Sequence, residues 1–130
     1  MEQSEKQILI EHRIEQAKKM VDVSELLIKN NEAESAINRI YYGMFYILLA
    51  FGLKNSFETS KHQQLIGWFN KNYIHTGQID KKYGRMIRKA YDKRMKSDYE
   101  VIVEIEIEEA ETLLADLREF ILEIESILKK

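Results

Sequence analysis

Residues 33–53, AESAINRIYYGMFYILLAFGL, are the longest apolar stretch of this 130-residue chain. Apolar side chains recur within it at short, helix-like steps, and aromatic rings fill the positions between them. This pattern predicts a helix that is buried on most of its surface, with the rest of the chain packed around it. The side chains expected in the core are Ala36, Ile40, Tyr41, Tyr42, Phe45, Tyr46, Leu48, Leu49 and Phe51.

Arg39 lies inside this apolar stretch, with Asn38 beside it. A charged side chain on a largely buried helix needs a polar partner or a water-filled cleft, because burying an unpaired charge is costly. Arg39 is therefore the first candidate functional residue.

The composition favours helices. The chain has no proline, five glycines and 32% charged residues, which suits long helices with solvated charged faces. We expect an all-α protein in which residues 1–130 form a single domain. The formal net charge of -2 gives no overall attraction to nucleic acid, so any RNA contact needs a local basic patch.

The expected location is the cytoplasm. The absence of cysteine excludes disulfides and thiol catalysis, and it fits a reducing compartment. The first ten residues, MEQSEKQILI, lack the pattern of a secretory signal. Residues 40–53 are too short and too rich in tyrosine to span a bilayer comfortably, so we expect no membrane association.

Working outward, four further helices are predicted. They cover residues 4–29, 60–73, 80–97 and 108–129, each with an apolar face. In the first of them, Ile8 and Leu26 belong to that face. Gly52 is expected to help end the central helix, and Ser60 to cap the next. The helix at 80–97 is the most basic segment of the chain.

Residues 101–107 alternate in polarity with a strand-like period, apart from Ile102. A lone strand has no partner in a helical chain. We therefore expect an extended connection or the start of the last helix, with a two-stranded pairing across a dimer as a lesser alternative. The prediction is an antiparallel up-and-down bundle of four long helices plus a shorter one.

The candidate chemistry rests on Arg39, His62, Arg94, Asp98 and Tyr99. An arginine on a basic helix, followed by Asp and Tyr in RMKSDY, can clamp a phosphate while the carboxylate or phenol orients it or exchanges a proton. The sequence contains no phosphate loop, nucleophile elbow or dinucleotide fingerprint, and its histidines lack metal-ligand spacing. We expect neither a metal nor a cofactor.

A purely structural interpretation stays open. Asp98 can serve only to neutralise Arg39 or Arg94, and Tyr99 can be a core ring with a satisfied hydroxyl. His62, just after a predicted helix start, fits an exposed or capping position equally well. The basic residues of 80–97 can form a solvated face.

At these residues the chain resembles a known family. NRIYYGMFY (38–46), SKH (60–62), FNKNYIHTGQI (69–79) and Arg94 followed by SDY (97–99) occur in the order seen in small prokaryotic HEPN-domain proteins. HEPN stands for the higher-eukaryote and prokaryote nucleotide-binding domain. The similarity is to the branch with an R-x-x-YYAMF-like helix and a terminal R-x-x-x-DY motif.

The resemblance implies a helical homodimer that acts as the toxin of a toxin-antitoxin module, neutralised by a minimal nucleotidyltransferase. Several HEPN groups are metal-independent ribonucleases whose active Arg and His lie in a cleft at the dimer interface. Arg94 matches that Arg, but Asp98 and Tyr99 stand where the His is expected. His62 is a candidate substitute, and Tyr99 is a candidate acceptor of a nucleotide from the antitoxin.

Two functions follow from the resemblance. In the first, Arg94 and Arg39 bind RNA phosphate, Asp98 positions them, and Tyr99 or His62 completes a catalytic site. In the second, the same cleft is noncatalytic and binds a nucleotide or docks a nucleotidyltransferase. A structural dimer with a buried polar network is a third reading.

Overall fold

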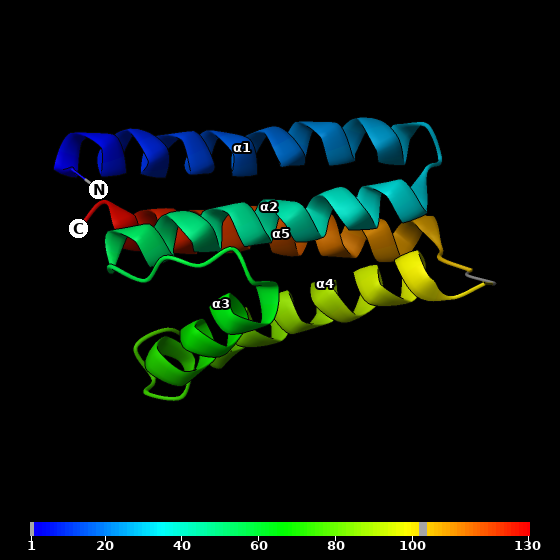
Figure 1. The fold of residues 1–130 in the computed structure, drawn as a ribbon. Helices are drawn as coiled ribbons and strands as arrows, with labels where there is room; N and C mark the ends of the chain where they lie inside the picture. The colour runs from blue at the N-terminus through cyan, green and yellow to red at the C-terminus, as the bar shows by residue number, and fades with distance from the viewer. Residues whose placement is uncertain (1, 102–103) are drawn as a thin grey trace.

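The fold is an antiparallel helical bundle, seen in a computed structural model that describes residues 2–101 and 104–130. All regular structure among these residues is helical, which confirms the all-α prediction. Successive long helices run up and down, and the two termini lie at the same end of the bundle (Figure 1). The elements are α1 (Gln3–Lys29), α2 (Ala33–Lys54), α3 (His62–Phe69), the π-helical turn η1 (Asn70–Ile74), α4 (Lys81–Tyr99) and α5 (Ile107–Leu128).

Helix α2 is the centre of the bundle, as its apolar sequence predicts. It packs against α1, α3, α4 and α5. Of the side chains expected in the core, Leu49, Tyr42 and Tyr46 are only partly buried. On α1, Ile8 and Leu26 are 66% and 61% exposed, so their assignment to the buried face was wrong. The fully buried side chains of α2 include Ala36, Ile37, Ile40, Tyr41, Met44, Ile47, Leu48 and Ala50.

The end of α2 differs from the prediction. Helix α2 continues past Gly52 to Lys54, and the left-handed residue that follows is Ser56, with φ 59°. Gly52 instead allows the chain to turn back closely. The Phe57 amide donates to the Gly52 carbonyl at 2.8 Å, and a Cβ on Gly52 would lie 2.6 Å from the Phe57 carbonyl oxygen. Glycine is thus required at position 52 because the Phe57 backbone leaves no room for a Cβ.

The start of α3 also differs from the prediction. The residue before the helix is Lys61, whose side chain makes no capping hydrogen bond, so Ser60 is not the cap. Thr59 Oγ1 instead accepts from the Lys61 amide at 3.2 Å. The predicted helix at 60–73 is interrupted by η1, and the chain then turns through Gly77 at φ 80°.

The connection to α5 matches the extended alternative where it is described. Glu104, Ile105 and Glu106 carry no helix or strand, and α5 begins at Ile107. Residues 102 and 103, on which part of the strand-like pattern falls, lie outside the described residues. At the other end of α4, the Asp80 carboxylate caps the helix by accepting from the Lys82 amide at 2.9 Å.

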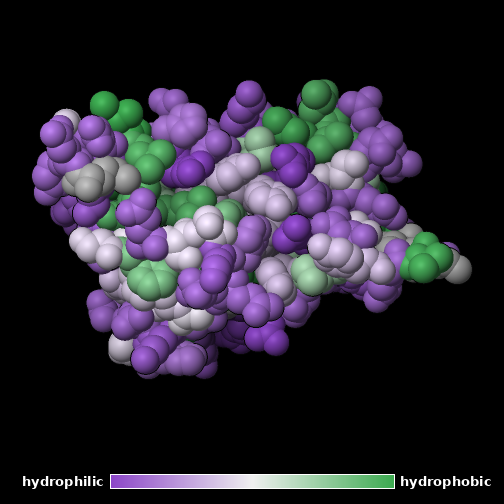
Figure 2. All heavy atoms as spheres, viewed as in Figure 1, coloured by the Kyte–Doolittle hydropathy of each residue, from purple (hydrophilic) through white to green (hydrophobic). Residues whose placement is uncertain are grey.

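The face seen in Figure 2 is mostly polar, with apolar side chains along α1 and at the tip of the α4–α5 connection. Within the described residues, α2 is the one helix long and apolar enough to cross a membrane. In α2, however, 72% of the most apolar 18-residue window is buried inside the molecule. The apolarity of α2 therefore reflects its place at the centre of the bundle.

Candidate functional site

The first element of the site is an ion pair on α4. Arg94 Nε lies 3.1 Å from Asp98 Oδ2, one helical turn further on. The Arg94 side chain is only 16% exposed, because α4 presses it against α2. Its guanidinium carbon lies 5.2 Å from the centroid of the Tyr41 ring and 5.1 Å from that of Tyr42. A guanidinium held by a carboxylate and two aromatic faces is fixed in place while keeping its charge.

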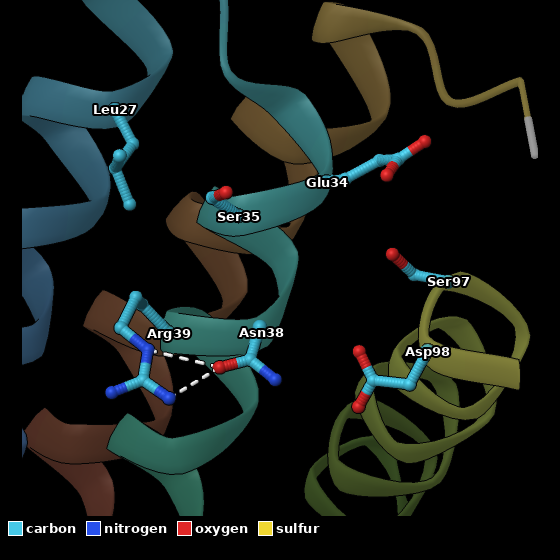
Figure 3. A pocket seen from close by; sticks show the side chains of 7 residues that line it. All are labelled: Leu27, Glu34, Ser35, Asn38, Arg39, Ser97 and Asp98. Carbon is cyan, nitrogen blue, oxygen red and sulfur yellow. Dashed lines mark hydrogen bonds between the residues drawn. The ribbon is translucent and has the colours of Figure 1, made fainter.

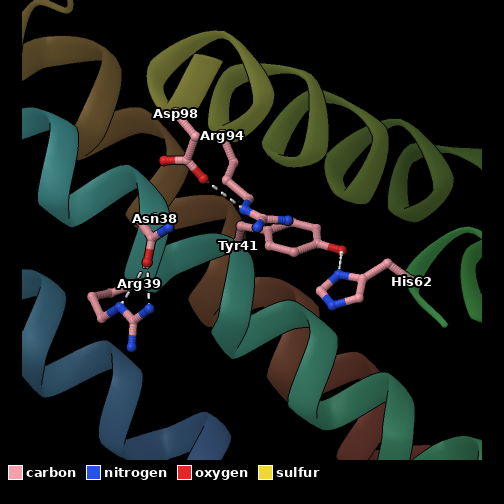
Figure 4. Close-up of polar contacts among 6 residues, drawn as sticks. All are labelled: Asn38, Arg39, Tyr41, His62, Arg94 and Asp98. Atoms are coloured by element: carbon pink, nitrogen blue, oxygen red, sulfur yellow. Dashed lines mark hydrogen bonds and ion pairs between the residues drawn. The ribbon is translucent and has the colours of Figure 1, made fainter. Parts of the chain in front are cut away.

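The second element joins α2 to the start of α3. The Tyr41 hydroxyl lies 2.7 Å from His62 Nδ1 (Figure 4). Tyr41 is fully buried, whereas His62 is partly exposed. The imidazole also stacks on the Phe45 ring, with centroids 3.9 Å apart and planes 9° apart. His62 is therefore held by one hydrogen bond and one stacked ring.

Burial decides the protonation of this pair. Burial raises the pKa of the Tyr41 phenol, an effect that the Arg94 charge opposes, so the hydroxyl stays protonated at neutral pH. Burial, with a smaller effect from Arg94, lowers the pKa of His62 below its usual 6.5. At pH 7 the site thus contains a neutral imidazole beside a permanent positive charge.

Arg39 also contacts the ring of Tyr42. Its guanidinium donates to Asn38 Oδ1 through both Nε, at 2.9 Å, and a terminal nitrogen. The guanidinium carbon is 5.0 Å from the Tyr42 ring centroid, so two arginines contact the same ring. Arg39 is only partly buried, and the partners of its charge are the neighbouring Asn38 and an aromatic face.

A hollow of about 350 Å³ separates Arg39 from Asp98 (Figure 3). Arg39 and Asn38 extend from α2 on one side, and Asp98 and Ser97 from the end of α4 on the other. A cation and an anion on opposite walls can bind a polar ligand that carries both donors and acceptors. The hollow is lined by Leu27, Glu34, Ser35, Asn38, Arg39, Ser97 and Asp98.

Residues 10–127 match the sequence family described as the HEPN domain. The chain belongs to the HEPN family. This HEPN protein is 32% identical to a "UPF0332 protein" of Thermotoga maritima over 97% of its own length and 96% of that protein's. It is 37% identical to a "Putative toxin" of Methanocaldococcus jannaschii, over 81% of this chain and 71% of that one. A second protein of the same organism with the same description is 31% identical over 93% and 90% of the two chains.

Tyr99 is placed differently from the other candidates of this HEPN protein. It is the last residue of α4 and is 71% exposed, so its hydroxyl is open to solvent and not part of the core. His12 and His75 are exposed as well. In residues 2–101 and 104–130, no group of three or more His, Cys, Asp and Glu side chains is arranged to hold a metal ion.

The structure brings Arg94, Asp98 and His62 together through a residue that the sequence did not single out. Tyr41 contacts both Arg94 and His62, yet its sequence context indicated only aromatic core. The sequence contains only a general signal: a phenol on a largely buried helix needs a hydrogen-bond partner, and His62 is one of many polar side chains in residues 54–64. Whether these residues are catalytic stays a prediction.

Proposed function

We propose that this HEPN protein is the toxin-like member of a toxin-antitoxin module and that it binds and cleaves RNA without a metal ion. The support is twofold. The chain is similar along most of its length to two proteins that carry the description "Putative toxin". Its Arg94 is fixed by Asp98 and by the rings of Tyr41 and Tyr42, with His62 attached to the same cluster.

The single observation that carries the proposal is this fixed guanidinium. An arginine oriented in advance stabilises the charge that builds on phosphate during attack, without reorganising at that moment. In the proposed reaction the RNA 2′ oxygen bonds to phosphorus while the bond to the 5′ oxygen breaks. The proton lost by the 2′-hydroxyl returns through solvent to the departing 5′ oxygen, leaving a cyclic phosphate and a 5′-hydroxyl.

The proposal assigns supporting roles to other candidates. Arg39 binds a second phosphate or the adjoining nucleotide across the hollow that Asp98 lines. Asp98 holds Arg94 and keeps its Nε occupied, so that the remaining guanidinium nitrogens are directed to the ligand. The exposed Tyr99 hydroxyl is accessible to a nucleotidyltransferase, which makes it the candidate modification site.

The proposed assembly is a cytoplasmic homodimer that a minimal nucleotidyltransferase antitoxin neutralises. A dimer would place a second copy of the Arg94 cluster near the first, as the family resemblance implies. Sedimentation of the purified protein, alone and with a nucleotidyltransferase encoded by an adjacent gene, tests both partners.

Cleavage of a mixed RNA pool in the presence of chelator tests the activity. Arg94→Ala should reduce the rate by about 100-fold or more, the usual effect of removing a preorganised charge-stabilising group. Arg88→Ala is the matched control, because Arg88 also pairs with a carboxylate one turn further on, Asp92, but is 74% exposed. Equal rates for both variants would contradict the proposal.

One observation favours the noncatalytic alternative. The carboxylate of Asp98 stands one turn after Arg94, where the family resemblance leads us to expect a histidine, and it is already paired with Arg94. If the natural protein cleaves RNA no faster than Arg94→Ala, the cluster is a binding site for a nucleotide or a nucleotidyltransferase. Titration with both ligands would then identify the occupant.

A further inference from the structure

We propose that Tyr41 is a positioning residue that fixes His62 with its proton on Nε2, so that His62 presents an N–H donor to a phosphate oxygen and does not act as a base. The assignment of the His62 tautomer is argued from geometry alone. The phosphate as its ligand rests on the proposed function.

The direction of the Tyr41–His62 hydrogen bond follows from burial. The Tyr41 side chain is fully buried, so water cannot reach its hydroxyl. In the part of the chain that the structure describes, His62 Nδ1 is the one hydrogen-bond partner of that hydroxyl, at 2.7 Å. If Nδ1 carried the proton, the hydroxyl hydrogen would have no acceptor, and an unsatisfied buried polar group is costly. The hydroxyl therefore donates and Nδ1 accepts.

The tautomer of His62 follows from this direction. A neutral imidazole carries one proton, and an Nδ1 that accepts a hydrogen bond leaves that proton on Nε2. Stacking on Phe45, with centroids 3.9 Å apart, opposes rotation of the ring about its Cβ–Cγ bond, which would put Cδ2 in the place of Nδ1. Tyr41 and Phe45 lie one helical turn apart on the same helix, so a single face of α2 sets both the tautomer and the ring plane.

His62 Nε2 is available to a ligand. Among the described residues, the buried side-chain polar atom without a hydrogen-bond partner is Ser24 Oγ. Within residues 2–101 and 104–130, His62 Nε2 has no hydrogen-bond partner, and it is not among the unpartnered buried atoms, so it reaches solvent. A neutral N–H that reaches solvent near the Arg94 guanidinium is suited to an oxyanion.

Arg94 and His62 are two hydrogen-bond donors that both contact the Tyr41 side chain. The Arg94 guanidinium lies against the Tyr41 ring, and His62 is attached to the Tyr41 hydroxyl (Figure 4). A phosphate group offers oxygens to both kinds of donor. The proton from an attacking hydroxyl cannot pass to an Nε2 that already carries one, so His62 acts in this site by binding.

The first test measures the tautomer directly, by nitrogen-15 NMR of the imidazole in the full-length protein near pH 7.5. The natural protein should show a protonated Nε2 and an unprotonated Nδ1. Tyr41→Phe should give a mixture of tautomers. Tyr83→Phe is the matched control, because it removes the hydroxyl of another buried tyrosine, which donates to the Glu119 side chain, yet it should leave His62 unchanged. A protonated Nδ1 in the natural protein would overturn the proposal.

The second test separates a donor from a base, using an RNA oligonucleotide with methylated 2′ oxygens for binding and unmodified RNA for cleavage. Glutamine offers an N–H donor but no basic nitrogen, so His62→Gln should stay within about five- to tenfold of the natural protein, whereas His62→Ala should lose more. Abolished cleavage in His62→Gln, with intact binding, would identify His62 as a base. If instead Arg94→Ala leaves RNA binding unchanged, the proposed function fails while the NMR result stands.

Discussion

Replacing Gly52 by alanine should destabilise the protein, although alanine is the better helix former. The added Cβ would lie 2.6 Å from the Phe57 carbonyl oxygen, a contact that a flexible side chain could relieve but a backbone group cannot. Moving Phe57 away also strains the 2.8 Å hydrogen bond from its amide to the Gly52 carbonyl. The chain between α2 and α3 would therefore have to shift, and His62 with it.

The size of the effect follows from three contributions. Overpacking costs about 1–3 kcal/mol, and a weakened hydrogen bond costs about 1 kcal/mol more. The higher helix propensity of alanine returns about 1 kcal/mol. The free energy of unfolding should fall by about 1–3 kcal/mol, which corresponds to a decrease in Tm of about 3–5 °C for each kcal/mol in a domain of this size.

Urea denaturation followed by the fluorescence of Trp68 is a suitable assay. Trp68 is the only tryptophan, and its ring stacks on Phe57 with centroids 4.8 Å apart, so it reports on the displaced segment. Gly67→Ala is the control, because no atom lies within 4 Å of the added Cβ and α3 should gain stability. A Gly52→Ala protein as stable as the natural one would refute the steric argument.

Leu117→Ala removes a fully buried side chain and should cost about 2–5 kcal/mol in urea denaturation. Burial and the charge of Arg94 lower the pKa of His62. The stability that neutral His62 contributes should therefore be complete above pH 6.5 and decrease as the pH falls below that value. In thermal unfolding, the Tm of His62→Gln should fall less over this pH range than the Tm of the natural protein. Burial raises the pKa of Asp116, although the charge of Lys89 opposes this effect. The stability that protonated Asp116 contributes is therefore present at low pH and is lost as the pH rises through the raised pKa, the reverse of the trend for His62. Asp116→Asn should therefore raise Tm at pH 7. RNA binding should weaken with added salt, and Arg94→Ala should reduce the slope of log K against log salt by about 1, which filter binding at several salt concentrations would reveal.

The sequence predicted the bundle well because the helices depend on local patterns. The apolar stretch of α2 and the stripe of α5 repeat with the helical period, and both are buried as expected. The predictions were wrong where the role of a residue depends on contacts with another part of the chain. Nothing local distinguishes a glycine that ends a helix from Gly52, which is needed because Phe57 returns to it.

The site was predictable in part for the same reason. The pairing of Arg94 with Asp98 follows from their spacing along one helix, and the two side chains lie 3.1 Å apart. The contact between Tyr41 and His62 joins residues 21 positions apart, across a loop whose path depends on tertiary packing. Sequence could indicate that Arg39 needs a partner, but not that Asn38 and the face of Tyr42 would serve.

The π-helical turn has a consequence for comparing this protein with its relatives. A turn closed from residue i to residue i+5 holds one residue more than an α-helical turn. Asn70 and Ile74, the first and last residues of η1, lie against α4, where an added Cβ on Gly84 would lie 3.1 Å and 3.2 Å from their side chains. A relative one residue shorter between positions 69 and 75 should continue α3 as an ordinary helix and tolerate a larger residue at position 84. A single-residue gap in an alignment and a glycine on a different helix should therefore vary together.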